Sequence, residues 1–580
     1  MTLESLANEL LLSIFEFFST GQLLQSFYGL KYRFDVLIFD HISVRGFDLR
    51  LVSKHDLDTV CQQYLPSIVN RITTLHLSDD ENSQQIVRFV AQDFTLHQFA
   101  HLRTLNLYDL ISVTMMNKIL LDCCHLSHLT HIKLTNCYFS CSQTDVANII
   151  NTIWSLPKLI YCYIDIDTSD GIEFSAPNII SSSLEYLFVP NMICHLSDFA
   201  QLIQSTARLR YLSACFTYDS DSKTYPSIIS LITHFDTWFV AAEQNNIINI
   251  FKHMPNLCSL TVRTINDISV DGRQWEKIIR DHLIKLKRFR LKLTRKLVND
   301  RNWKQSFDEL INSFRSQFWL EEHRWFVQCD WDPDIAAIYL YTLPYAFDHF
   351  TAYFPLIFES TCPHNNCYCS YDRVNQLKYM HFLSDDLDQC QNISFSNVRD
   401  LTIYLPINNH LWTIVPNFHQ LTSLSVAWYN YDEKFPSQLQ LLLDRASRLN
   451  SLSIETWRSS PTQMAPFEIT HNLIRKLDLY SYHYHYNNAD CTVLSCSSLG
   501  IQCEILRISV EIRTCVLDLV KKMPNLHQLI VHCRDDNYRE QSMTTTDELV
   551  EWLQQQLPSK YGIARNICLA NEIKINLRIC

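Results

Sequence analysis

The chain has 580 residues, of which 47% are hydrophobic and 19% are charged, and its formal net charge is −12. This length and composition indicate a globular protein built from several domains or from one elongated repeat array, and the net negative charge argues against a nucleic-acid partner. Only 7 residues are glycine and no two lie within seven residues of each other, which excludes the clustered glycines of phosphate-binding loops.

Neither the cysteines nor the apolar segments indicate secretion or membrane insertion. The 21 cysteines are scattered and odd in number, which favours reduced, buried thiols over a disulfide framework. The N-terminal segment carries Glu4, Glu9 and Glu16 and lacks the early basic residues of a secretory signal. The longest apolar stretch, residues 335–358, is interrupted by two prolines and by Asp348, so it predicts no transmembrane helix. We therefore expect a soluble protein of the cytoplasm or the nucleus.

Residues 1–50 form a predicted helical module. Ser5 is the expected N-cap of a first helix and Thr20 that of a second, and a third apolar run follows. Three short helices cannot bury all of these apolar side chains among themselves, which indicates a partner surface. The apolar positions at helical spacing in the first helix are Leu6, Leu10, Ile14, Phe17 and Phe18.

The segment LESLANELLLSIFEFFSTGQLLQSFYGLKYRFDVLIFD, under a tenth of the chain, resembles an F-box. This motif docks on the Skp adaptor of cullin-RING ubiquitin ligases. The family opening, Leu-Pro-x-Glu-Leu, then Ile-Phe and a further Leu, reads here Leu6-Ala7-Asn8-Glu9-Leu10, then Ile14-Phe15 and Phe18. Ala7 departs from the usual Pro, and Phe34 stands for the common Trp of the third helix. A helical cap on the following repeats is the alternative interpretation.

The resemblance implies which residues dock on the Skp adaptor. Some of these residues can instead belong to the hydrophobic core of the module itself. Leu6 and Leu10 are the strongest candidates for partner-facing anchors, because a few buried apolar side chains usually dominate an interface. The docking positions carried over by the match are Leu6, Glu9, Leu10, Ile14, Phe18, Leu23 and Leu24.

A repeated pattern follows the module. Each copy has three apolar residues: the second comes three positions after the first, and the third comes two positions after the second. The spacings between starts are 30, 27, 30, 25 and 25 residues, then a double step of 48, a step of 29, a gap of 112, and steps of 23, 28, 25, 29 and 23. The fourteen copies begin at Ile72, Leu102, Leu129, Leu159, Leu184, Leu209, Leu257, Leu286, Val398, Leu421, Leu449, Ile474, Cys503 and Leu526.

This pattern resembles leucine-rich repeats. Each copy predicts a short strand whose apolar side faces the core, followed by a return segment, and the copies must stack to bury that side. The expected fold is α/β, with an N-terminal three-helix F-box-like module followed by an irregular leucine-rich-repeat solenoid, or horseshoe. An ordinary domain of right-handed βα units is the alternative. The expected parts are 1–50, a first repeat arc at 51–291, an aromatic block at 292–397 and a second arc at 398–580.

The aromatic block at 292–397 is either an insertion or a run of degenerate repeats, and the sequence leaves this open. It contains a cluster that can be tested as a zinc site, although the spacing departs from the usual ribbon pattern. The favoured interpretation is a turn with incidental cysteines and no metal. The cluster consists of Cys362, His364, Cys367 and Cys369.

Two further constellations invite a chemical interpretation. The Cys123 to Cys141 region is rich in Cys and His, but the repeat already explains the positions of His131 and Cys137. Residues 480–486 alternate Tyr with Ser and His and are either a solvated loop or an aromatic recognition loop. No nucleophile elbow, zincin motif or kinase motif is present. We expect no catalysis, no metal and no cofactor.

The two resemblances together imply a non-catalytic substrate receptor of an SCF-type ubiquitin ligase, with the Skp adaptor and an unknown target protein as partners. A repeat scaffold without a ligase link and an enzyme hidden in residues 292–397 are the alternatives. Outward strand residues between the core positions are the candidates for target contact, and their mixed character suits a protein target. They are His76, Asn106, Lys133, Tyr163, Phe188, Arg290, Asp478 and Arg507.

Overall fold

A computed structural model of the chain divides into two compact units. The first comprises Met1–Val270 and Gln274–Leu293, and the second comprises Asp271–Arg273 and Thr294–Ile579. The structure describes residues 3–50, 52, 54–79, 86, 89, 95–139, 142–168, 173–217, 231–241, 244–264, 270–297, 302–333, 335–354, 357–363, 371–381, 393–407, 409–428, 434–456, 468–480, 484–536, 547–558, 561–565 and 572–577.

Three helices open the first unit: α1 (Asn8–Phe15), α2 (Thr20–Phe27) and α3 (Tyr32–Arg45). The two predicted caps are wrong. Ser5 lies in a 3-10 turn, and α1 begins after Ala7 without a side-chain cap. Ser19 caps α2, because its hydroxyl accepts a hydrogen bond from the Gln22 N–H while the Gln22 side chain accepts one from the Ser19 N–H. This capping box satisfies two backbone donors at once, which is why the helix begins at Thr20 instead of being capped by it.

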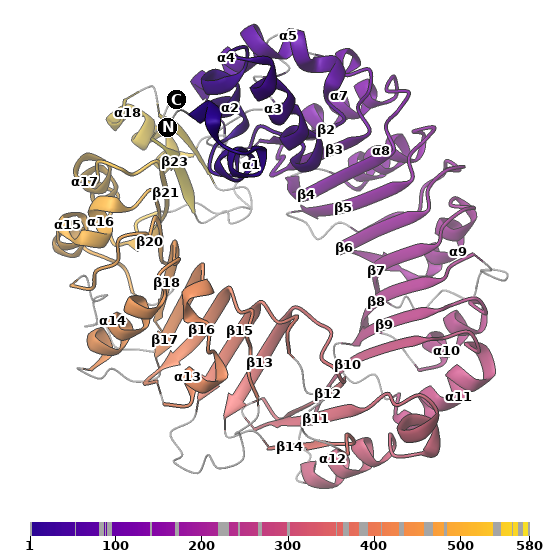
Figure 1. Cartoon of the computed structure of the whole chain (residues 1–580). Coiled ribbons are helices and arrows are strands. Elements are labelled where there is room, and N and C mark those ends of the chain that lie inside the picture. Colours follow the sequence, from indigo (N-terminus) through magenta and orange to yellow (C-terminus); the bar gives the residue numbers. More distant parts are fainter. Residues whose placement is uncertain are drawn as a thin grey trace. The chain divides into compact units, whose positions relative to one another are not determined.

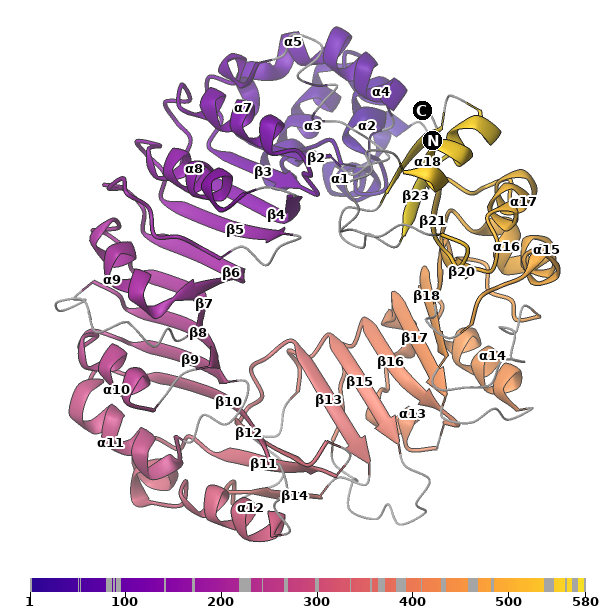
Figure 2. The same ribbon diagram turned by 180° about the vertical axis from the view of Figure 1, so that it is seen from behind.

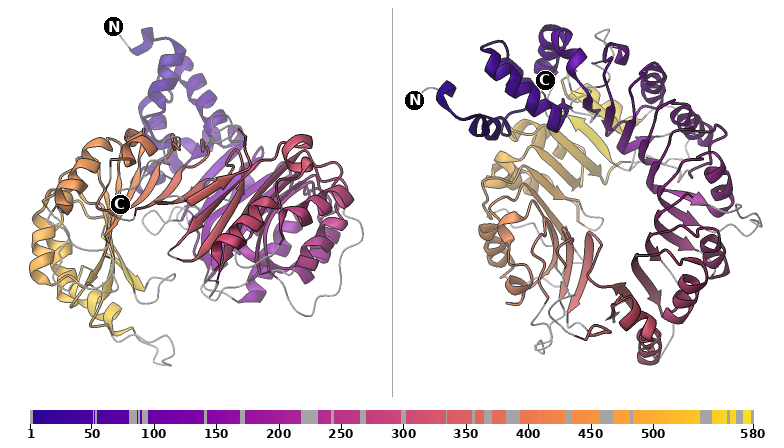
Figure 3. Two further views of the ribbon diagram at one scale, coloured as in Figure 1. Left: turned by 90° about the horizontal axis from the view of Figure 1, so that it is seen from below. Right: turned by 45° about the vertical axis from the view of Figure 1, so that its right-hand side comes forward.

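The helical module has a small aromatic core of its own. The Phe27 ring lies 5.2 Å from the Phe15 ring and 5.8 Å from the Phe34 ring, centroid to centroid, and Leu11 and Ile38 are fully buried beside them. In both views of Figure 3 the three helices extend away from the sheet of the first unit. A helical connection leads on to the first long strand: α4 (Lys54–Thr59), a π-helical turn (Val60–Tyr64), α5 (Leu65–Ile68) and a 3-10 turn (Val69–Arg71).

The repeats of the first unit stack as a parallel sheet in chain order. Helices cover one face of this sheet, and none of the helices in the described ranges lies on the other face (Figures 1 and 2). The strands are β1 (Phe47–Asp48), β2 (Thr74–Ser78), β3 (Thr104–Tyr108), β4 (His131–Phe139), β5 (Tyr161–Thr168), β6 (Tyr186–His195), β7 (Tyr211–Thr217), β8 (His234–Ala241), β9 (Ser259–Thr264) and β10 (Arg288–Lys296), and the helices are α7 (Val113–Cys123), α8 (Gln143–Trp154), α9 (Leu196–Gln204), α10 (Gln244–Lys252) and α11 (Gly272–His282).

The repeat pattern determines the register of this sheet. The middle apolar residue of each copy pairs with the middle residue of the next, so that one continuous ladder is buried under the helices. The ladder runs Phe47, Leu75, Leu105, Ile132, Cys162, Leu187, Leu212, Phe235, Leu260 and Phe289. The predicted repeat stack is therefore confirmed in this unit.

The double step of 48 residues contains a repeat that the sequence pattern missed. Strand β8 lies between β7 and β9, and its core positions are Ile232, Phe235 and Thr237, exposed by 1%, 2% and 1%. The sequence pattern did not identify this copy because its third position is a polar residue, Thr237. The spacing is therefore regular across the gap.

The second unit begins with α12 (Trp303–Asn312), a π-helical turn (Phe318–Glu322) and an antiparallel group of strands. Here β11 (Val327–Asp332) pairs with both β12 (Ala337–Thr342) and β14 (Ile357–Ser360). A parallel sheet then starts inside the aromatic block, at β13 (His349–Phe354) and β15 (Gln376–His381). The block thus holds an antiparallel element and two further repeats, whose buried positions are Phe347, Phe350 and Ala352, and Val374, Leu377 and Tyr379.

The parallel sheet of the second unit continues in register to β21, and an antiparallel hairpin ends it. The strands are β16 (Asp400–Leu405), β17 (Ser423–Trp428), β18 (Ser451–Thr456), β19 (Lys476–Leu479), β20 (Ile505–Val510), β21 (Gln528–Cys533), β22 (Gly562–Arg565) and β23 (Ile573–Asn576), and the helices are α13 (Leu411–Ile414), α14 (Phe435–Arg445), α15 (Asn488–Cys496), α16 (Ser498–Gln502), α17 (Thr514–Lys522) and α18 (Glu548–Gln556).

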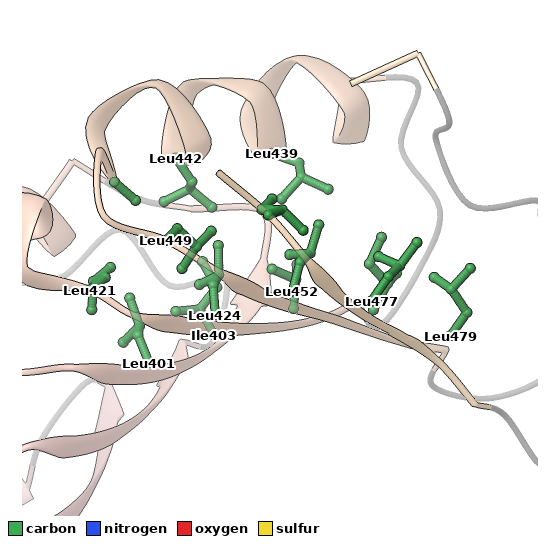
Figure 4. Close-up of a cluster of buried hydrophobic side chains, with 14 of the residues drawn as sticks. Leu401, Ile403, Leu421, Leu424, Leu439, Leu442, Leu449, Leu452, Leu477 and Leu479 are labelled. Atoms are coloured by element: carbon green, nitrogen blue, oxygen red, sulfur yellow. The ribbon is translucent and has the colours of Figure 1, made fainter. Parts of the chain in front are cut away.

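Leucines from strands and helices interlock in the core of the second unit. Figure 4 shows Leu439 and Leu442 reaching from α14 toward Leu424 and Leu452 on the strands below. All four side chains are fully buried, so the helix holds neighbouring repeats together as well as its own. Among the helices of the described ranges, none has the length and apolar character needed to span a membrane.

Candidate functional site

The helix-free face of the first unit carries the side chains that alternate with the buried ladder. In each repeat these are the residues just before and just after the middle core position, and the strand register aligns them in two rows. The first row holds Thr74, Thr104, His131, Tyr161, Tyr186, Tyr211, His234, Ser259 and Arg288, and the second row holds His76, Asn106, Lys133, Tyr163, Phe188, Ser213, Asp236, Thr261 and Arg290.

Seven of these side chains form a continuous band of rings over β4 to β8, which we name the aromatic face. Ring centroids lie 5.5 Å apart for His131 and Tyr161, 4.6 Å apart for Phe188 and Tyr211, and 5.8 Å apart for Tyr211 and His234. The angles between these ring planes are 23°, 29° and 18°. The rings therefore stand on the sheet with their faces against one another and their edges outward. The aromatic face consists of His131, Tyr161, Tyr163, Tyr186, Phe188, Tyr211 and His234.

The tyrosine hydroxyls of the aromatic face have no partner among the described residues of the chain. All four, on Tyr161, Tyr163, Tyr186 and Tyr211, are available as hydrogen-bond donors. Tyr186 is 37% exposed and the other three rings are half-buried. Partial burial raises the pKa of Tyr211 above its usual range, so the hydroxyl keeps its proton at neutral pH.

A cationic strand, β10, lies on the same sheet face two strands beyond the aromatic face. Arg288, Arg290 and Lys292 alternate with buried residues along β10 and therefore share the helix-free face. On the neighbouring strand Arg263 pairs with Lys292 in register, and its guanidinium donates to the Asp236 carboxylate at 2.7 Å. These cations contrast with the net charge of −12 of the whole chain.

Six of the eight predicted target-binding residues lie in the second row of this face: His76, Asn106, Lys133, Tyr163, Phe188 and Arg290. They are not equally accessible. Asn106 is only 7% exposed, and its amide donates to His76 Nδ1 at 3.2 Å. Burial also lowers the pKa of His76 below its usual range. The Lys133 ammonium lies 4.8 Å from the Tyr163 ring centroid, so the row is linked from strand to strand.

The other two predicted residues lie in the second unit and bind each other. The Arg507 guanidinium donates to Glu572 at 2.7 Å and to Asp478 at 3.4 Å, and it covers the Tyr480 ring at 4.3 Å. Glu572 is only 1% exposed. The role of this pair in target binding stays a prediction, and its visible role is to join β19, β20 and the C-terminal hairpin.

The first row was missed by the sequence analysis, which considered only the residue after the middle core position. The signal was present, since the residue before that position is aromatic or histidine in five successive repeats. The hidden copy at β8 supplied the last of them. These residues are His131, Tyr161, Tyr186, Tyr211 and His234.

The predicted docking residues of the N-terminal module divide into exposed and buried ones. Leu10 is 54% exposed and Glu9 is also exposed, whereas Leu23 and Leu24 are exposed by 1% and 0% and belong to the module's core. Leu6, Ile14 and Phe18 are half-buried. The docking role of all seven stays a prediction.

Arg33 holds the start of the module in place. Its guanidinium donates to the Glu4 carbonyl at 2.7 Å, to the Leu6 carbonyl at 2.6 Å and to the Asn8 side chain at 2.9 Å and 2.7 Å. The segment that precedes α1 is thereby fixed against α3. Around it the module exposes an unusual number of apolar side chains: Leu3 by 41%, Leu10 by 54%, Phe17 by 88%, Leu30 by 63%, Tyr32 by 84%, Val36 by 38% and Val44 by 83%.

The structure describes the candidate metal clusters only in part. No group of three or more metal-ligating side chains occurs within the described ranges. Cys362 is buried, while His364, Cys367, Cys369 and Cys141 lie outside those ranges. Burial raises the pKa of the Cys123 and Cys137 thiols, which matches their place in the repeat core.

The predicted aromatic loop at 480–486 is described only in part, because residues 481–483 lie outside the described ranges. Tyr486 is 3% exposed and its pKa is raised by burial. The Tyr484 hydroxyl donates to Asp490 at 2.9 Å, at the start of α15. These two tyrosines therefore support the fold of the second unit.

Comparisons with known proteins give limited information. No protein-family model matches the chain, and no curated protein matches it. Among solved structures, an internalin from Listeria monocytogenes aligns over 84% of this chain and 94% of that chain, with 10% identity and a TM-score of 0.26. At that score the fold assignment rests on the chain's own strands. Two parallel sheets of stacked Leu-x-x-Leu-x-Leu strands give it the architecture of a leucine-rich-repeat protein.

Proposed function

We propose that the chain is a non-catalytic substrate-recognition adaptor of an SCF-type cullin-RING E3 ubiquitin ligase, acting in the cytoplasm or the nucleus. The helix-free face of the first unit binds a target protein, and the N-terminal module docks on the Skp adaptor. The cullin-bound RING and E2 then modify the target, so that this chain supplies binding and no covalent chemistry, metal or cofactor.

The observation that carries target binding is the aromatic face. Tyrosine and other aromatic side chains are enriched in protein interfaces and contribute disproportionately to their affinity. Here seven rings form one band on a sheet face without helices, and four hydroxyls have no partner among the described residues. Such a surface supports a protein-binding role for the repeats.

The exposed apolar side chains of the N-terminal module support docking on a partner. A concentration of large exposed apolar side chains in one short module favours an interface. Leu10 on the first helix, at 54% exposure, and Phe17 in the turn that follows it, at 88%, are the most accessible apolar side chains of this segment. Glu9, the acidic residue of the F-box-like opening, is exposed one position before Leu10.

The second candidate is a repeat scaffold without a ligase link, in which the helices only cap the array. One observation favours it: α2 packs on α4, and α3 packs on β1 at the start of the sheet. A cap makes contacts of this kind, since end repeats need cover for their apolar side.

Binding of the full chain to purified Skp adaptor separates the two candidates. We expect Leu10→Glu and Phe17→Glu each to abolish capture of the chain by the adaptor, while circular dichroism stays unchanged because both side chains are exposed. Leu441→Glu, at a 42% exposed position of α14, is the matched control and keeps binding. A folded wild-type chain that fails to bind would favour the scaffold, with Ala7 as the first residue to replace by Pro.

A further inference from the structure

We propose that the surface over β4 to β10 of the first unit binds an acidic, extended polypeptide segment. The inference rests on the proposed target-binding role of this unit and adds the chemistry of the target. Carboxylates of the segment accept hydrogen bonds from the tyrosine hydroxyls of the aromatic face and pair with the cations of β10.

The aromatic face presents donors and positive ring edges to a partner. Because the rings stand face to face, as Phe188 and Tyr211 do at 4.6 Å, the negative faces of the π-systems are turned toward one another. The outward edges carry the positive end of the quadrupole. The hydroxyls of Tyr161, Tyr163, Tyr186 and Tyr211 add four donors without a partner among the described residues. Carboxylate oxygens are the acceptors that complement such a surface, since charge-assisted hydrogen bonds are the stronger kind.

The charges of the two rows also favour an acidic partner. Over β4 to β10 these rows hold the cations Lys133, Arg288 and Arg290 and a single carboxylate, Asp236. That carboxylate is already bound to Arg263 at 2.7 Å. Lys292 extends the positive strip further along β10.

The next outward acid, Asp165 on β5, is bound within the chain. Its carboxylate accepts hydrogen bonds from the Asn191 side chain at 2.6 Å and from the Asn136 N–H at 3.2 Å. The two rows therefore attract an anionic partner and repel a basic one.

The dimensions suit a short segment that crosses the strands. Five strand spacings separate β5 from β10, which is about 24 Å at roughly 4.8 Å per spacing. An extended chain covers that distance with about seven residues. Side chains of such a segment meet the tyrosines at one end and the β10 cations at the other.

The ring geometry argues against single-stranded nucleic acid as the occupant. Bases bind proteins by stacking on exposed aromatic faces, and here those faces lie against one another, with plane angles of 18° for Tyr211 and His234 and 23° for His131 and Tyr161. The surface offers edges and hydroxyls instead of platforms.

Fluorescence anisotropy with the full chain tests the proposal. The probes are three labelled ligands: a ten-residue peptide of alternating Glu and Ser, the same peptide with Lys in place of Glu, and a ten-nucleotide thymidine oligomer. We expect the Glu peptide to bind in a salt-dependent manner and the Lys peptide not to bind. Arg288→Glu with Arg290→Glu should raise the Kd of the Glu peptide by about tenfold or more.

A second variant isolates the hydroxyls. Tyr186→Phe with Tyr211→Phe keeps the rings and removes two donors, and it should also raise the Kd by about tenfold. Lys378→Glu with Lys476→Glu is the matched control, because both lysines lie on strands of the second unit and are exposed. It should leave the Kd unchanged.

Three results would overturn the proposal: no binding of the Glu peptide by the wild-type chain, an equal loss in the control variant, or tighter binding of the thymidine oligomer. Capture by the Skp adaptor is measured on the same preparations. Lost adaptor capture with retained peptide binding would refute the ligase role alone, and the reverse result would refute the acidic-segment proposal alone.

Discussion

Replacing Thr237 by valine should stabilise the first unit. Thr237 occupies the third core position of the hidden repeat on β8, faces Ala214 and Val262 on the adjacent strands, and is 1% exposed. Its hydroxyl has no hydrogen-bond partner among the described residues. Valine has the same shape and replaces that hydroxyl with a methyl group.

The size of the effect follows from the cost of the buried hydroxyl. A buried polar group without a partner costs about 1–3 kcal/mol. We therefore expect Thr237→Val to raise the free energy of unfolding of the first unit by about 1–3 kcal/mol. Urea unfolding followed by far-UV circular dichroism measures it as a higher midpoint with an unchanged slope.

A matched control separates this effect from the general preference of strands for valine. Thr104→Val changes a half-buried threonine on the helix-free face and should shift stability by less than about 0.5 kcal/mol. A Thr237→Val variant that is neutral or less stable would refute the reasoning, because it would mean that the hydroxyl is satisfied in solution, for instance by an internal water.

Two further predictions concern the second unit. Leu452→Ala should cost about 2–5 kcal/mol of its unfolding free energy, because the side chain is fully buried under α14; the 42% exposed Leu441→Ala should cost far less, and equal losses in urea unfolding would contradict the packing in Figure 4. Burial raises the pKa of Asp330 from 3.8 to about 6, against opposing hydrogen bonds from Gln328 and Tyr341. The folded state thus favours the protonated acid, so the contribution of Asp330 to the free energy of unfolding is greatest below pH 4 and falls by about 3 kcal/mol as the pH rises from about 4 through 6. Asp330→Asn should reduce the dependence of the unfolding midpoint on pH between pH 4 and 6. An unchanged slope in the variant would mean that other groups cause this pH dependence.

Most strands were predictable from the apolar triplet that recurs at the repeat spacing. Leu75, Leu105 and Leu424 sit in the buried ladders as the pattern requires. The pattern failed at β8, where Thr237 stands in for an apolar residue, and at β13, whose copy ends in Ala352 and lies inside the aromatic block. Stacking explains both cases, because neighbouring repeats bury such residues whatever their own hydrophobicity.

The candidate site was only half predictable. Register placed Lys133, Tyr163 and Phe188 in one row as expected, because alternation in a strand determines which face a residue occupies. Alternation does not show that Tyr161 and Tyr211 approach the same phenylalanine from a different row. That contact depends on ring orientation across strands, which one repeat considered alone does not reveal. The hydrogen bond between Asn106 and His76 likewise depends on side chains from two neighbouring repeats.

The C-terminal hairpin has a consequence for solubility. Strand β23 pairs antiparallel with β21, and the four-residue β22 is the last strand of the sheet. Without the hairpin, the backbone donors and acceptors of β21 would lie open along a strand that carries Leu529 and Val531, and an open apolar edge of this kind recruits strands from other molecules. The two short antiparallel strands β23 and β22 cover that edge of the sheet. The hairpin thus prevents the open edge of the sheet from pairing with strands of neighbouring molecules.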